Sequence, residues 1–67
     1  MLHTFVVQTQ HGAELNTNFR LETTDPLKTD EIEFLGSMRK VTGVELAPAG
    51  HTHSGKYILT IASPTSN

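Results

Sequence analysis

The sequence predicts an α+β fold of ββαββ order, in which a single helix packs on one face of a four-stranded mixed sheet. Three observations lead to this fold class. Two β-rich segments, residues 2–10 and 17–23, open the chain. Apolar residues then recur with a helical period over residues 26–41. Two further β-type segments, residues 44–48 and 56–62, complete the order.

The first two strands are predicted to form a hairpin. Residues 2–10 (LHTFVVQTQ) are rich in β-branched and aromatic side chains, which favour a strand. Residues 11–16 supply the glycine and asparagine that a hairpin connection needs. Residues 17–23 alternate, with Phe19 and Leu21 on one face and polar side chains on the other, as in a half-buried strand.

The segment 26–41 has the pattern of an amphipathic helix. It has two possible starts, because Asp25 can cap the helix with Pro26 at its first position, or Thr29 can cap it instead. At about 100° per residue one apolar stripe emerges. The residues on this stripe are Leu27, Phe34, Leu35, Met38 and Val41. Ile32 lies off the stripe, so its truncation is expected to cost less stability than truncation of the stripe residues.

Chain direction sets the expected sheet. Pro48 restricts the segment 44–48 to an edge or an end, whereas the segment 56–62 (KYILTIA) is apolar on both faces and suits a central position. The first and last strands then run parallel, and a right-handed crossover gives the order 2-1-4-3. This topology resembles the β-grasp arrangement of ubiquitin-like and immunoglobulin-binding domains, although no sequence motif of those families is present. The expected core is Phe5, Val7, Phe19, Leu21, Phe34, Leu35, Met38, Val41, Val44, Leu46, Leu59 and Ile61, with Tyr57 at its margin.

Composition bounds both the architecture and the function. The 67 residues allow one small domain, which we place at residues 1–62, followed by a flexible tail at residues 63–67. There is no cysteine, so disulfides and thiolate metal sites are excluded, and a cytoplasmic location is expected. A net charge of −2 with scattered basic residues gives no reason to expect a nucleic-acid partner, and the sequence has no membrane-spanning apolar run.

The better functional lead is the sheet face away from the predicted helix. Central strands should place aliphatic side chains there, although a sheet face open to water is normally polar. This predicted binding face comprises Leu2, Thr4, Val6, Ile58, Thr60 and Ala62. An apolar strip of this kind indicates that another protein surface covers it.

A second candidate is a histidine cluster at one end of the molecule. Chain direction should bring His3, His51 and His53 near the acidic start of the predicted helix. Imidazole and carboxylate groups are good zinc ligands, so one interpretation is a surface metal site. The other is an ordinary polar turn in water.

No catalytic pattern is present. The serines lack a nucleophile-elbow context, and no oriented base accompanies them. We therefore expect a non-enzymatic protein-interaction module of accessory, adaptor or inhibitor type, without a cofactor or a small-molecule substrate, acting through the open sheet face or an edge strand. The partner is expected to be another copy of the chain or another protein. The alternative is a small regulator that binds a metal ion through the histidines or contacts nucleic acid weakly.

Overall fold

The chain folds almost entirely into β-structure. The computed structural model describes residues 1–62. Its elements in chain order are β1 (Leu2–Thr9), β2 (Glu14–Glu22), the short 3₁₀ helix η1 (Pro26–Lys28), β3 (Glu31–Phe34), β4 (Ser37–Leu46) and β5 (Tyr57–Ile61). The predicted α+β class is therefore wrong, since no α-helix lies in the described residues. The predicted tail at residues 63–67 lies outside them.

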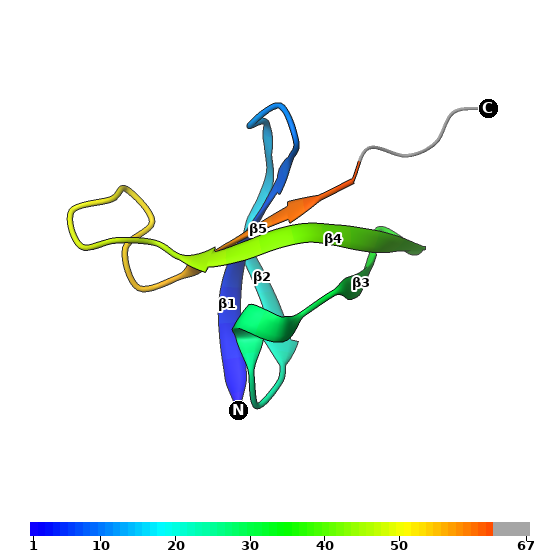
Figure 1. The fold of residues 1–67 in the computed structure, drawn as a ribbon, viewed down its shortest axis with the longest axis horizontal. Helices are drawn as coiled ribbons and strands as arrows, with labels where there is room; N and C mark the ends of the chain where they lie inside the picture. Colours follow the sequence, from blue (N-terminus) through cyan, green and yellow to red (C-terminus); the bar gives the residue numbers. More distant parts are fainter. Residues whose placement is uncertain (63–67) are drawn as a thin grey trace.

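The five strands make one strongly curved mixed sheet, a half-barrel of order β2-β1-β5-β4-β3 (Figure 1). Neighbouring strands are antiparallel except β1 and β5, which run parallel with Val6 opposite Ile58. The parallel pairing of the first and last strands, which chain direction predicts, is present. The connection between them is different, because a hairpin extends the sheet where a helix was expected to cover it.

That hairpin, β3–β4, replaces the predicted helix. Ile32 and Phe34 are 2% and 4% exposed, while Glu31 and Glu33, which alternate with them, are exposed to solvent, which is the two-residue period of a strand. The turn that follows consists of two residues with positive φ, Leu35 at 53° and Gly36 at 82°. Two such residues between paired strands match a type I′ hairpin, which suits the natural twist of the strands.

The observed burial of side chains contradicts the predicted helical stripe. Leu35 and Met38, which the helix would bury, are 88% and 59% exposed, and Ile32, which it would leave outside, is in the core. The predicted short strand at residues 44–48 corresponds only to the last three residues of β4, which ends at Leu46. Helix formation would also place Gly36 inside the helix, at a cost of about 1 kcal/mol relative to alanine. Strand pairing carries no such helix-propensity cost.

The core fills the concave side of the half-barrel. Its buried members are Phe5, Val7, Ile32, Phe34, Leu59 and Ile61, and the side chains packed against them are Phe19, Leu21, Val41, Val44 and Tyr57. Three residues predicted for the core, Leu35, Met38 and Leu46, are exposed instead. The rings of Phe19 on β2 and Phe34 on β3 meet edge to face with centroids 5.9 Å apart. This contact brings the two edge strands toward each other and explains the curvature of the sheet.

Replacing Leu35 with asparagine should stabilise the protein. An L-residue other than asparagine or glycine loses about 1–2 kcal/mol at positive φ, and Asn-Gly is the preferred type I′ pair. Leu35 buries almost nothing, so little packing is lost in exchange. We expect the free energy of unfolding, measured by urea denaturation, to rise by about 1 kcal/mol. A Leu35→Val variant is the control and should be destabilised, because β-branched side chains tolerate positive φ poorly.

Candidate functional site

The outer, convex face of the sheet is covered over the middle of β1. Val6 and Ile58 alternate with core residues and therefore face outward, yet they are only 1% and 8% exposed. The expectation that Val6 lies on an open face is thus wrong, whereas Ile58, although nearly buried, lines a hollow on that face. Of the other residues predicted for the binding face, Leu2 is 56% exposed, and Thr4, Thr60 and Ala62 are half-buried.

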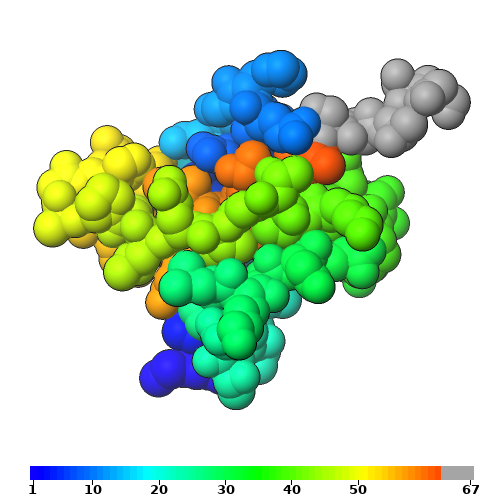
Figure 2. All heavy atoms as spheres, in the orientation of Figure 1, coloured from blue at the N-terminus to red at the C-terminus, as the bar shows by residue number. Residues whose placement is uncertain are grey.

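Two residues of the loop 47–56 reach the β1–β2 hairpin, which the loop lies beside (Figure 2, yellow). His53 Nε2 is 2.8 Å from a carboxylate oxygen of Glu14 on β2. Lys56 Nζ donates to the Thr17 carbonyl at 2.7 Å and to Asn18 Oδ1 at 3.1 Å, both also on β2. Because β1 lies between β5 and β2, these contacts tie the loop and its end across β1.

A β-bulge provides the acceptor for Lys56. The register of β1 with β2 shifts between Phe5 and Val7, so that β2 has an extra residue opposite Val6. A bulge interrupts the ladder and leaves a backbone group free for another donor. The lysine side chain reaches from the β5 side across β1 to this carbonyl on β2, which accounts for the low exposure of Val6 on the strand between them.

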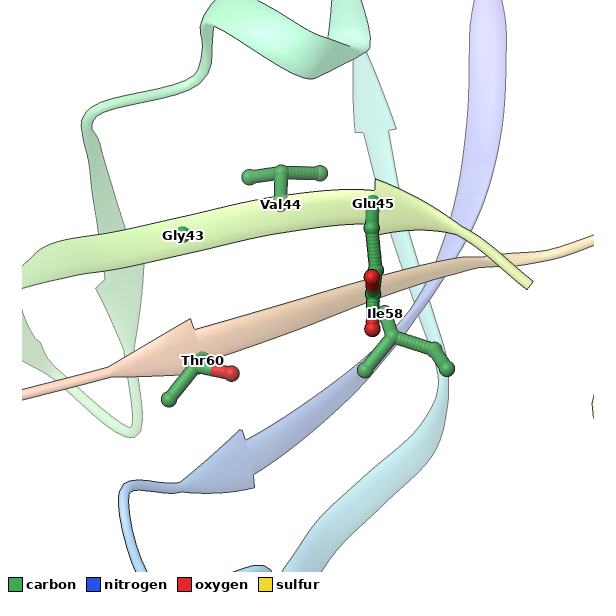
Figure 3. Close-up of a pocket in the computed structure, with 5 residues that line it drawn as sticks. All are labelled: Gly43, Val44, Glu45, Ile58 and Thr60. Atoms are coloured by element: carbon green, nitrogen blue, oxygen red, sulfur yellow. The ribbon is translucent and has the colours of Figure 1, made fainter.

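The uncovered part of the outer face lies over β4 and β5 and contains a shallow hollow of about 270 Å³. Its lining residues are Gly43, Val44, Glu45, Ile58 and Thr60 (Figure 3). Glu45, Ile58 and Thr60 project to one side of the sheet and Val44 to the other. Gly43 leaves the hollow open, since a Cβ built there would meet no atom within 4 Å. The register of β4 with β5 also shifts just before Gly43, which places a second bulge at this point.

Polar groups of the hollow are sparse. Gln8 Nε2 donates to Thr60 Oγ1 at 3.1 Å, and Thr42 Oγ1 donates to the Thr60 carbonyl at 3.2 Å. Glu45 is the only ionisable residue in the lining. Lys40 lies on the same outer face of β4 beyond Thr42, because it pairs with the outward-facing Glu31. The hollow therefore combines an aliphatic floor with one carboxylate and has a lysine further along the strand.

Sequence reasoning found two residues of the hollow, Ile58 and Thr60, and missed three. Gly43 was assigned the end of a helix, and Val44 and Glu45 were assigned a strand without a binding role. The alternation of residues 43–46 could have identified Glu45, because pairing of the two strands places it on the same face as Ile58. The bulge that opens the hollow has no signature in the sequence beyond the glycine itself.

The three histidines do not assemble into a metal site. His3 stacks edge to face on Tyr57, with ring centroids 5.5 Å apart, at the margin of the core. His51 and His53 lie together in the loop, where the His53 amide donates to His51 Nδ1 at 3.0 Å. Residues 1–62 contain no group of three or more histidine, cysteine, aspartate or glutamate side chains placed to hold a metal ion. Only His51 and His53 therefore lie in a polar turn, while His3 is a partly covered residue of β1.

Comparisons with known proteins add no functional information. No protein family, curated protein or solved structure matches this chain. Within residues 1–62, no helix is long and apolar enough to cross a membrane. Any functional conclusion must come from the geometry of the sheet and its surface.

Proposed function

We propose that this protein is a small non-enzymatic interaction module that docks a protein partner on the outer face of β4 and β5. The hollow lined by Gly43, Glu45, Ile58 and Thr60 is the observation that carries the proposal. A glycine at a bulge keeps this surface open where a side chain would fit, while the loop of residues 47–56 covers the neighbouring strands. Absence of cysteine suits a cytoplasmic location, which is part of the proposal.

Docking on the face is favoured over docking on an edge strand. Both edges carry the features that discourage strand addition. β2 has a bulge and the exposed charges Arg20 and Glu22, and β3 is only four residues long with two exposed glutamates. The face over β4 and β5 has no comparable protection.

The chemistry of the hollow suits binding better than catalysis. Its hydroxyl, on Thr60, is hydrogen-bonded to an amide, and activation of a nucleophile requires a base oriented by a third group. An aliphatic floor beside one carboxylate suits a partner side chain with an apolar stem and a positive end.

Filling the hollow should abolish binding without harming the fold. Gly43→Val adds a β-branched side chain into open space at a position where φ is not positive, so we expect stability to be kept or raised by about 0.5–1 kcal/mol. Ser37→Val is the matched control, because it adds similar bulk to an exposed position of the same strand, outside the hollow.

The measurement compares proteins retained from an extract of the cells that naturally produce this chain. The proposal predicts at least one protein that the parent and the Ser37→Val control retain and the Gly43→Val variant loses. Thermal unfolding of all three verifies that the fold is intact. Identical retention by the parent and by a folded Gly43→Val variant would overturn the proposal.

A further inference from the structure

We infer that the occupant of the outer face is a second copy of this chain, with the two convex faces in contact along their β4 strands, which run antiparallel. The inference rests on the proposed function, because it names the partner of the same surface. The distribution of charge along β4 carries it.

Lys40 and Glu45 flank the bulge on the outer face of β4. Their pairing partners fix that face, since Lys40 lies opposite the solvent-facing Glu31 and Glu45 lies opposite Ile58, which points away from the core. Both side chains are exposed. Within residues 1–62, neither makes an ion pair or a side-chain hydrogen bond. The strand thus presents one positive and one negative group, about 16 Å apart along its length.

This arrangement is self-complementary. A two-fold axis that passes between Thr42 and Gly43 and lies across the strands reverses the direction of β4 in the second copy. Lys40 of each copy then faces Glu45 of the other, so one geometry forms two equal pairs, as an isologous interface requires. The glycine bulges of the two copies meet at the centre, where the absence of side chains lets the backbones approach closely.

The other charged side chains on the outer face do not oppose this arrangement of the two copies. Glu31 and Glu33 lie on β3, which pairs only with the Ser37–Lys40 half of β4. The two-fold axis places this half over the other half of the partner strand, which has no β3 beside it. The glutamates of the two copies are therefore kept apart. A parallel stack would instead bring Lys40 of one copy against Lys40 of the other, which is repulsive.

The size of the face predicts a weak dimer. β4 is about 33 Å long, whereas β3 and β5, about 4.8 Å to either side of it, are only about half that length or less, so the contact area is roughly 300 Å² per copy. The sum for two copies is below the roughly 1,200–2,000 Å² of stable interfaces. Association should therefore be micromolar or weaker and should depend on salt, because its exposed charge pairs are screened by ions.

Charge exchange tests the inference. Sedimentation equilibrium is measured for the parent, Lys40→Glu, Glu45→Lys and the double exchange, at protein concentrations up to about 1 mM. Each single variant converts two attractive pairs into two repulsive ones, so its dimer should be about tenfold weaker, whereas the double exchange should restore the parent affinity. Asp25→Lys makes the same change in net charge as Glu45→Lys, but in the loop before η1, and should leave the dimer unchanged.

The outcomes separate this inference from the proposed function. A monomeric parent over the whole concentration range overturns self-association. Failure of the double exchange to restore a dimer that both single variants weaken also overturns it. In either case, loss of a retained protein on filling the hollow with Gly43→Val would still support docking of a different partner. Dimer formation with rescue by the double exchange supports both proposals.

Discussion

Ile32→Ala is expected to be among the most damaging single truncations in the chain. The side chain is 2% exposed and belongs to the core on the concave side of the sheet. Truncating a buried isoleucine costs about 2–5 kcal/mol, because the lost transfer energy adds to the cost of the cavity. A domain of this length has a total stability of only about 3–10 kcal/mol, so the variant should be largely or partly unfolded at 25 °C.

The matched control is Met38→Ala, on the strand that pairs with β3. Met38 is exposed on the outer face, and its truncation should change the free energy of unfolding by less than about 0.5 kcal/mol in urea denaturation. If residues 26–41 formed a helix, the opposite result would be expected: truncation of Met38 would cost more stability than truncation of Ile32. Comparable losses at both positions would contradict the strand register as well as the helix.

Val6→Lys is the second substitution with a large expected effect. Val6 is 1% exposed, on the outer side of the sheet, where Lys56 reaches across β1. A lysine there would bury an unpaired ammonium beside the existing Lys56, and an uncompensated buried charge costs several kcal/mol. We expect loss of the cooperative thermal transition and of the dispersed amide resonances that mark a folded sheet.

Leu2→Lys provides the comparison for this result. Leu2 lies on the same strand and on the same face, four residues earlier, but is more than half exposed. Its replacement should leave the thermal transition within a few degrees of the parent, since surface substitutions usually change stability by about 0.5 kcal/mol or less. A folded Val6→Lys protein would mean that the loop does not seal the outer face over β1.

The hairpin region shows why local pattern alone could not decide the fold. Residues 31–41 carry two patterns at once, an alternation through Ile32 and Phe34 and a helical stripe through Phe34, Leu35 and Met38. Which pattern is buried depends on the partner surface. Phe19 lies against Phe34 across the half-barrel, and Ile61 lies opposite Val41 in the sheet. These long-range contacts favour the strand, and the Leu35-Gly36 turn allows it.

The predicted binding face failed for a related reason. Alternation correctly places Val6 and Ile58 on the side of the sheet away from Phe5 and Leu59, but it says nothing about what covers that side. The cover depends on the bulge opposite Val6, whose carbonyl binds Lys56, and on the contact of His53 with Glu14. Both join residues almost 40 positions apart, so no local rule anticipates them.

By itself, the sequence determined the features that depend on neighbouring residues and on chain direction. These are the first hairpin, the last strand and the parallel pairing of β1 with β5, because alternation, turn residues and the number of reversals act locally or follow from connectivity. Tertiary structure alone decided whether residues 31–41 became helix or hairpin, and which part of the outer face stayed open. Both outcomes depend on burial against distant strands, where the free energy of packing exceeds the small differences in local propensity.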